Sequence, residues 1–403
     1  MHHNGRICHK ECGKILRPEQ KRIFAVTHAP TPVHAGWPAS RAGAVLTVDL
    51  DAVVHNYHLL KARAPKAVCA AVVKADAYGL GAAQVAPVLA GAGVAEFFVA
   101  HVDEGLALRP HVGACAGITV LHGPRPDAVE ACLAHGLRPV LNSLEQIGWV
   151  RAVACARQRR VGVVLQLDTG MSRFGLSVQD VRQIAADPAL LDGLDVQLVM
   201  SHLACADEPE NPANAEQAAR LKAYAALLPV RAPLSLAASS GVFLGAEYHF
   251  NLVRPGAALY GVAPHPHVPN PLRAVVGLKA HVLQTRTLAK GERVGYGLTW
   301  RAGGPCRVAT IAVGYADGFV RARDKGFAWF GGHKLPILGR ISMDSMTVDI
   351  SAIPEGQLEA DGMVELLNAT YGVDHVAAAE GTIGYEVLTS LGHRYHRTYV
   401  HAA

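Results

Sequence analysis

No stretch of the 403-residue sequence approaches the ~18 consecutive apolar residues that a membrane-spanning helix requires. The beginning of the chain is basic, but the apolar run that follows, residues 23–26, is far shorter than the ~7 to 15 apolar residues of a secretory signal. We therefore expect a cytoplasmic protein without a membrane segment.

The sequence also lacks a surplus of one charge outside its first 44 residues. Those 44 residues hold seven basic and two acidic residues, and the other 359 are formally neutral. This balance gives no reason to expect a nucleic-acid-binding surface on the folded part. The eight cysteines are scattered, and beyond residue 44 no two have C-x-x-C spacing, so we expect reduced thiols and no metal site.

Strand-like and helix-like segments alternate over residues 44–237. This alternation predicts a parallel sheet, and eight units would close a (β/α)₈ barrel, with a doubly wound open sheet as the alternative. Asp51 is the expected cap of the first helix. The expected strands are 44–50, 67–73, 96–100, 118–121, 139–141, 161–167, 196–200 and 234–237.

Polar residues gather at or just beyond the C-terminal ends of these strands. They are Lys74, His122, Asn142, Asp168, Arg173, His202, Ser239 and Ser240. Each of them alone is explained as an ordinary loop residue. Because the C-terminal strand ends of a barrel carry the active site, their shared position indicates a functional site there.

Lys74 follows the apolar run 70–73 and precedes Tyr78, Gly79 and Gly81. Burial would lower the pKa of such a lysine, and a neutral amine can form a Schiff base with an aldehyde. A lysine that leaves the strand end toward water is the other interpretation. This segment alone does not decide between the two.

After Gly261 the helical periodicity gives way to short alternating segments, such as 279–286, 307–313, 335–341 and 346–350. This pattern predicts an all-β domain. The expected parts are a basic, disordered N-terminal tail, 1–43, a (β/α)₈ barrel, 44–275, and a C-terminal β-domain, 276–403.

Six ordered motifs across residues 44–400 give the chain a specific resemblance. They are Ala71-Val72-Val73-Lys74-Ala75-Asp76-Ala77-Tyr78-Gly79, Asp168-Thr169-Gly170-Met171-Ser172-Arg173-Phe174-Gly175, Arg254-Pro255-Gly256-Ala257-Ala258-Leu259-Tyr260-Gly261, Val294-Gly295-Tyr296-Gly297, Gly314-Tyr315-Ala316-Asp317-Gly318 and Ser342-Met343-Asp344. The chain resembles the alanine racemases, pyridoxal-phosphate enzymes with a barrel of fold type III and a C-terminal β-domain. The resemblance implies a homodimer that interconverts L- and D-alanine and supplies D-alanine for peptidoglycan.

The resemblance implies two catalytic bases. Lys74 would hold pyridoxal 5'-phosphate as an aldimine and act as the base on one face of the substrate Cα. Tyr296, supplied by the partner subunit, would act on the other face; on the sequence alone, a core tyrosine between two glycines is the alternative. Bases on opposite faces can take a proton from either enantiomer and return one from the other side.

The resemblance also implies the binding residues. Arg254 would face the pyridine nitrogen and keep it unprotonated, because a guanidinium does not readily release its proton. Arg173 and the Met343 backbone would receive the substrate carboxylate. The remaining cofactor ligands would be Tyr78, His202, Ser239 and the backbone amides of Gly256 and Ala257.

Three positions depart from the family pattern. Gln166 stands where many members carry a modified lysine that positions the arginine, here Arg173. Ser240 could take the place of Ser239 at the phosphate, and His393 stands where some relatives place a phosphate-contacting tyrosine. We expect these changes to affect binding details and not the reaction.

Other activities use the same fold. A broad-specificity or serine racemase would differ only in pocket shape, and one methylene is worth only ~1 to 3 kcal/mol of discrimination. A basic-amino-acid decarboxylase would share the barrel and Lys74, but it has no need of a second base at Tyr296. A single-domain pyridoxal-phosphate-binding homeostasis protein would end near residue 260, and this chain continues.

Overall fold

The computed structural model describes residues 37–266, 268–321 and 326–402. Most of the predicted tail, residues 1–36, lies outside the described residues. Trp37 is described, and its amide donates to the carbonyl oxygen of Tyr395 at 3.2 Å. Within the described ranges, no helix combines the length and the apolar character that crossing a membrane would need.

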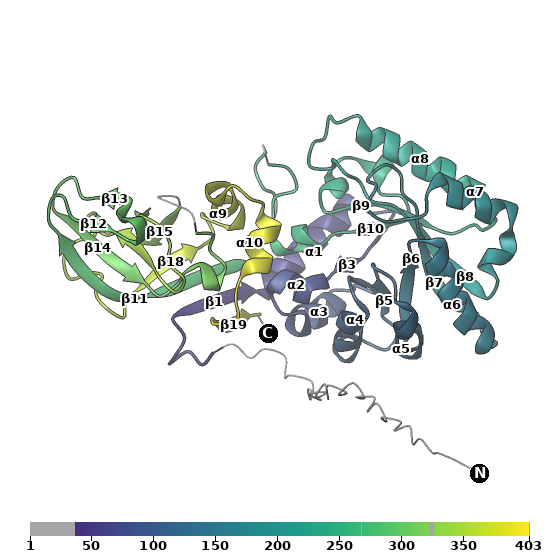
Figure 1. Cartoon of the computed structure of the whole chain (residues 1–403), viewed down its shortest axis with the longest axis horizontal. Coiled ribbons are helices and arrows are strands. Elements are labelled where there is room, and N and C mark those ends of the chain that lie inside the picture. The colour runs from purple at the N-terminus through teal and green to yellow at the C-terminus, as the bar shows by residue number, and fades with distance from the viewer. Residues whose placement is uncertain (1–36, 267, 322–325, 403) are drawn as a thin grey trace, which may run out of the picture. The chain divides into compact units, whose positions relative to one another are not determined.

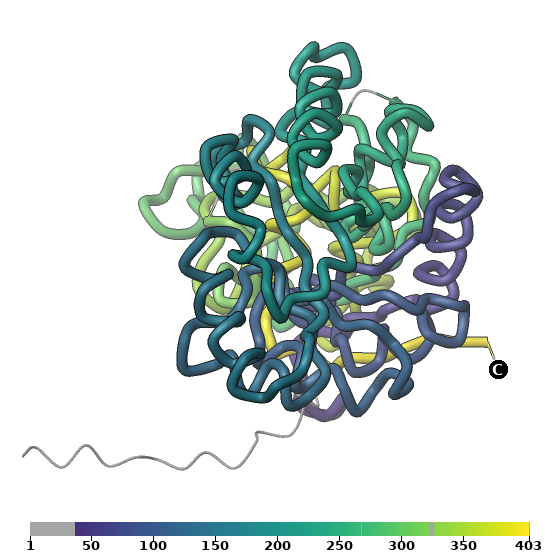
Figure 2. Tube along the Cα trace, turned by 90° about the vertical axis from the view of Figure 1, so that its right-hand side faces the viewer, coloured from purple at the N-terminus to yellow at the C-terminus, as the bar shows by residue number. Residues whose placement is uncertain are grey.

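Parallel strand segments form a closed barrel. Two of them, β2 and β3, are halves of one strand interrupted at Ala70, and they pair with β10 and β4 respectively, which closes the ring. In Figure 2 the barrel segments follow one another round this ring in chain order, from purple and blue through teal to green. The strands are β2 (Val68–Cys69), β3 (Ala71–Val72), β4 (Glu96–Val99), β5 (Gly117–Val120), β6 (Leu137–Leu141), β7 (Val161–Gln166), β8 (Leu194–Met200), β9 (Leu234–Ala238) and β10 (Leu252–Arg254).

Helices lie along the outside of these strands (Figure 1). They are α1 (Leu50–Arg63), α3 (Ala82–Gly91), α4 (Val102–Leu108), α5 (Val129–Ala134), α6 (Leu144–Ala156), α7 (Val178–Ala186) and α8 (Ala213–Leu227), and a short turn, α2 (Lys74–Gly79), precedes α3. The predicted cap of α1, Asp51, was wrong. Asp49 is the cap, because its carboxylate accepts the Ala52 amide at 2.8 Å, and residue 51 is already helical.

The second sheet is largely antiparallel. Its long strand β11 pairs with both β18 and β14, which closes a ring through β15, β16 and β17, and β1 and β19 extend the sheet from β11. Its strands are β1 (Ala44–Asp49), β11 (Val276–Leu288), β14 (Cys306–Ile311), β15 (Phe327–Phe330), β16 (His333–Leu338), β17 (Met346–Asp349), β18 (Met363–Leu367) and β19 (His396–Val400). The segments β12 (Arg293–Val294) and β13 (Trp300–Arg301) form a separate hairpin, and the helices α9 (Val373–Glu380) and α10 (Gly384–Ser390) precede β19.

The barrel that the sequence predicted is present, but one of its eight strands was misassigned. The strand predicted at 44–50 is β1, which pairs with β11 and β19 in the second sheet. Its burial alternates residue by residue, as expected when one face of a strand is packed and the other is open. The strand that takes its place in the barrel is β10, whose three residues before Pro255 are too few to show a periodicity.

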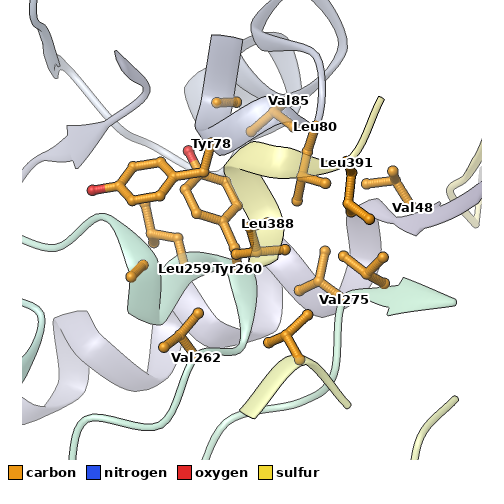
Figure 3. Close-up of a cluster of buried hydrophobic side chains, with 14 of the residues drawn as sticks. Val48, Tyr78, Leu80, Val85, Leu259, Tyr260, Val262, Val275, Leu388 and Leu391 are labelled. Atoms are coloured by element: carbon orange, nitrogen blue, oxygen red, sulfur yellow. The ribbon is translucent and has the colours of Figure 1, made fainter. Parts of the chain in front are cut away.

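One hydrophobic cluster is shared by the barrel and the second sheet. Figure 3 shows part of it, where Tyr78, Leu80 and Tyr260 from the barrel pack together with Leu388 and Leu391 from the C-terminal segment. The loops that follow the first barrel strand are therefore supported by residues from the end of the chain.

Candidate active site

Lys74 begins a left-handed turn directly after the first barrel strand. The residues Ala75, Asp76, Ala77 and Tyr78 have φ values of 52–57°, a conformation that costs an L-residue roughly 1–2 kcal/mol each. Burial lowers the pKa of Lys74, the charge of Arg173 lowers it further, and the Glu104 carboxylate opposes both effects. The amine is thus closer to its neutral, nucleophilic form than a lysine in water.

Arg254, which is buried, and His202, which is partly exposed, form one wall of the site. One terminal nitrogen of Arg254 donates to Ser235 Oγ, and the other donates to the Ser201 carbonyl oxygen at 2.7 Å and lies 3.5 Å from His202 Nδ1. Burial lowers the pKa of Arg254 to about 10, so it remains a cation at neutral pH. Burial, aided by the nearby cations, lowers the pKa of His202 to about 3, so its ring is neutral.

Backbone amides and hydroxyl groups converge beside this wall. The Oγ of Ser239 accepts the amides of Gly256 at 3.0 Å and Ala258 at 3.1 Å. A methyl group at Gly256 would clash with the Tyr78 hydroxyl and stand 2.9 Å from Tyr78 Cζ, so glycine allows the phenol to reach this point. Amides and hydroxyls of this kind fit a phosphate group.

Ser239 Oγ takes the amides of Gly256 and Ala258 as its own donors, and the predicted role of the neighbouring Ala257 amide stays a prediction. Sequence analysis missed one further member of this group. Tyr385 of α10 also reaches the group: burial raises its pKa, and side-chain hydrogen bonds with Ser240 and Ser239 oppose that rise. A cavity of about 600 Å³ lies alongside and is lined in part by His202, Ser239 and Tyr385. His393, the position predicted by register, is exposed between α10 and β19.

The Arg173 loop is built by local hydrogen bonds. Asp168 Oδ1 accepts three successive amides, those of Gly170, Met171 and Ser172, at 2.9 to 3.1 Å. Gln166 Nε2 donates to the Phe174 carbonyl oxygen at 3.5 Å, so it contacts the backbone of the loop next to Arg173. The Arg173 guanidinium lies over the Phe174 ring, and its charge acts on both Lys74 and His202.

Tyr296 and Met343 lie on neighbouring loops of the second sheet domain and are exposed, at 65% and 53% respectively. Tyr296 stands between two glycines with positive φ, and Gly295 lies against the Arg340 backbone. Among the described residues, no hydrogen bond or ion pair joins Tyr296 to Lys74. Interactions within the single chain join Lys74, Tyr78, Arg173, His202, Ser239, Arg254 and Gly256 into one group. In the described ranges, no hydrogen bond or ion pair connects Tyr296 or Met343 to this group.

Arg394 holds two of these loops together. Its Nε and Nη2 donate to the two carboxylate oxygens of buried Asp317 at 2.7 and 2.8 Å, and its Nη1 donates to Asp344 at 2.6 Å. Asp344 follows Met343 directly. The bidentate pair therefore ties the Met343 loop to the loop around Asp317.

Known proteins match this chain over nearly all of its two sheet domains. Residues 48–264 match the family model described as alanine racemase, N-terminal domain, and residues 275–399 match alanine racemase, C-terminal domain. A protein named catabolic alanine racemase from Mesorhizobium japonicum is 50% identical over 378 residues, which cover 93% of this chain and 99% of that protein. Another of the same name from Agrobacterium fabrum is 48% identical, with 90% of this chain and 93% of that protein covered.

Solved structures agree with these relatives. The alanine racemase from Bartonella henselae, crystallised with covalently bound pyridoxal phosphate, is 39% identical, with a TM-score of 0.85 and coverage of 89% of this chain and all of that one. The biosynthetic alanine racemase from Pseudomonas aeruginosa is 35% identical, with a TM-score of 0.82 and the same coverage.

Proposed function

This chain belongs to the alanine racemase family, and from that membership we propose that Lys74 and Tyr296 are its two catalytic bases. The enzyme interconverts L- and D-alanine with pyridoxal 5'-phosphate as cofactor. One observation supports the residue assignment. The half-buried Lys74, whose pKa is lowered, lies at the same end of the barrel as the Ser239 hydroxyl with its amide donors and the buried cation of Arg254.

The residues present fit the cofactor. The Ser239 hydroxyl, the Gly256 and Ala257 amides and the Tyr78 hydroxyl would hold its phosphate, and Lys74 would hold its aldehyde carbon. When bound, pyridoxal phosphate supplies an electron-withdrawing ring that acidifies the Cα–H bond of the amino acid. Arg254, still charged at neutral pH, would donate to the ring nitrogen, and the neutral His202 ring would pack beside it.

Lys74 Nζ serves one face of the substrate. Burial and the charge of Arg173 lower the pKa of Lys74, which favours the neutral amine that can accept a proton. Arg173 would bind the substrate carboxylate, and the loop beneath it is held by Asp168 and Gln166. This arrangement would direct the Cα–H bond toward one of the two bases.

Tyr296 serves the opposite face and comes from the partner in a homodimer. A base has to be shielded from water to control one proton, yet Tyr296 is 65% exposed in the single chain. Leu298, Tyr315 and Met343 are exposed on the same set of loops, which supports burial of this surface against a second copy. The Met343 backbone would then complete the carboxylate site from the partner.

Racemisation runs in both directions, so the site alone sets no physiological direction. Two relatives are named catabolic and one structural neighbour is named biosynthetic. We propose that the reaction supplies D-alanine for peptidoglycan, and the same residues would serve consumption of D-alanine.

The test of the residue assignment is Lys74→Ala. We expect it to remove the yellow colour of the bound cofactor and to reduce Cα hydrogen exchange by several orders of magnitude, because it removes the amine that would bind the cofactor aldehyde and act as a base. The assay is incubation with L-alanine, L-serine and other L-amino acids in deuterated water, with chirality and deuterium followed together. The control is Lys66→Ala, which changes an exposed lysine at the other end of the same strand and should leave both signals intact. A coloured and active Lys74→Ala protein would refute the assignment.

A further inference from the structure

The left-handed turn that carries Lys74 makes some hydrogen bonds of its own. The amides of Ala77, Leu80 and Gly81 donate to the carbonyl oxygens of Val73, Ala77 and Asp76 at 3.0, 3.2 and 2.9 Å, and the Ala82 amide donates to Asp76 Oδ1 at 2.7 Å. These local hydrogen bonds, worth about 1 kcal/mol net each, stand against roughly 1–2 kcal/mol of strain in each of four consecutive L-residues. The turn persists only where its surroundings hold it.

Glu104, on α4, holds the first end of the turn. Its Oε1 accepts the Ala75 amide at 2.8 Å, and its Oε2 accepts the amides of Ala100 at 2.6 Å and His101 at 3.2 Å. One carboxylate therefore joins the residue after Lys74 to the end of the neighbouring strand β4. Since each oxygen has its own amide donors, an amide side chain of the same size could satisfy only one of the two sides.

Arg397, on β19 of the second sheet, holds the other end. Its Nη1 donates to the Gly79 carbonyl oxygen at 2.6 Å, and its Nη2 donates to the Gly392 carbonyl oxygen at 3.1 Å. The Tyr399 hydroxyl adds a hydrogen bond to the Leu80 carbonyl oxygen at 3.0 Å. Both residues belong to a strand that lies more than 300 positions further along the chain.

The underside of the turn is fixed by packing. Figure 3 shows Leu80 in one apolar group with Leu388 and Leu391. A methyl group at Gly79 would stand 2.8 Å from the Leu388 carbonyl oxygen, so α10 lies directly against the turn. The turn can therefore move only if its hydrogen bonds to Glu104, Arg397 and Tyr399 break and this packing is lost.

We propose that Glu104 and Arg397 are positioning residues that hold the Lys74 turn from both ends and thereby place the Lys74 amine. The proposal rests on the proposed role of Lys74 as a catalytic base. Neither residue is assigned to contact substrate or cofactor. The consequence is that the last strand of the second sheet controls a catalytic group in the barrel.

The test uses Glu104→Gln and Arg397→Gln with two matched controls. Asp180→Asn changes the capping-box carboxylate of α7, which accepts the Ser177 amide at 2.8 Å, and Arg157→Gln removes the hydrogen bonds of Arg157 to Glu130. Hydrogen exchange of the amides of residues 75–81 is measured by mass spectrometry on cofactor-free protein. The holoenzymes give kcat and KM for alanine and a melting temperature.

We expect exchange in residues 75–81 to rise about ten- to a hundredfold in both variants, because each leaves turn groups unpaired. We expect kcat to fall by about the same factor with KM little changed, because a misplaced base slows proton transfer without weakening carboxylate binding. The controls should change neither quantity. Arg397→Lys, which keeps one charged donor, should recover part of kcat.

Two results would overturn the proposal. One is exchange at the wild-type rate in residues 75–81 of both variants, and the other is faster exchange with an unchanged kcat. If a glutamine variant does not fold, Glu104→Asp and Arg397→Lys are judged by the same two criteria. The exchange measurement does not depend on the assignment of Lys74 as a catalytic base. A failure of that assignment, seen in Lys74→Ala, can therefore be told apart from a failure of the proposal that Glu104 and Arg397 hold the turn.

Discussion

If Tyr296 completes the site of the partner subunit, two inactive variants should restore each other. Lys74→Ala removes one base and Tyr296→Phe removes the hydroxyl of the other. In a mixed dimer, one site contains both lesions. The other site combines the intact Lys74 of the Tyr296→Phe chain with the intact Tyr296 of the Lys74→Ala chain.

The expected recovery follows from the arrangement of the site. The barrel supplies Lys74, the Ser239 and Gly256 groups and Arg254, whereas Tyr296 stands 65% exposed on a loop of the second sheet domain. Within the described part of the chain, no hydrogen bond or ion pair joins Tyr296 to them. Random reassortment of equal amounts makes about half of the dimers mixed, and each has one complete site of two, so about a quarter of wild-type activity should return.

The assay is co-refolding of the two variants, with native mass spectrometry to count mixed dimers and racemisation to measure activity. The control replaces Tyr296→Phe by the double variant Lys74→Ala/Tyr296→Phe. Every site in that mixture lacks Lys74, so no activity should appear. Mixed dimers that form in the expected proportion but stay as inactive as their parents would refute the exchange of Tyr296 between subunits.

Two further predictions concern Gly256 and His202. Gly256→Ala should weaken cofactor affinity about ten- to a hundredfold, because the new methyl group forces Tyr78 aside at a cost of about 1–3 kcal/mol. The control, Gly148→Ala, places its methyl group in open space and should leave cofactor affinity unchanged. Equal cofactor affinities in the two variants would contradict this prediction. The pKa of His202 is about 3 in the folded chain and near 6.5 in the unfolded chain. Below pH 6.5 the unfolded chain therefore binds a proton that the folded chain does not, and the folded state loses stability as the pH falls. Between pH 7 and pH 5 this group should remove about 2 kcal/mol from the free energy of unfolding, and urea titrations of cofactor-free His202→Gln should show a loss smaller by that amount; an identical loss in the variant would refute the effect.

Much of the fold followed from local patterns. Buried parallel strands produce short apolar runs, and turns and caps between them have their own residue preferences, so seven of the eight barrel strands were predicted near their observed positions. The positions of Lys74, His202 and Ser239 after strand ends follow from the same regularity, because each strand carries the residue that follows it to one edge. Arg254 lies on β10, which the pattern did not show, and its role was expected from the family motif alone.

The errors came where local pattern and tertiary role diverge. The strand β1 precedes a helix, as a barrel strand would, but it pairs with β11 and β19, which are more than 220 residues away. The strand β10 is too short to show any periodicity, and its pairing with β9 and β2 defines it. The spacing of apolar residues along the sequence does not indicate which distant strand a given strand will pair with.

The sequence by itself determined the barrel, the β-domain and the family motifs, because these depend on periodicity and on residue types at fixed separations. Only the tertiary structure decided what holds those motifs in place. Glu104, Tyr385, Arg394 and Arg397 stand in no motif that we recognised, yet they contact the Lys74 turn, the phosphate cradle and the Met343 loop. Their contacts span from 29 to 318 positions, and a hydrogen bond depends on where the folded chain brings donor and acceptor, not on their separation in sequence.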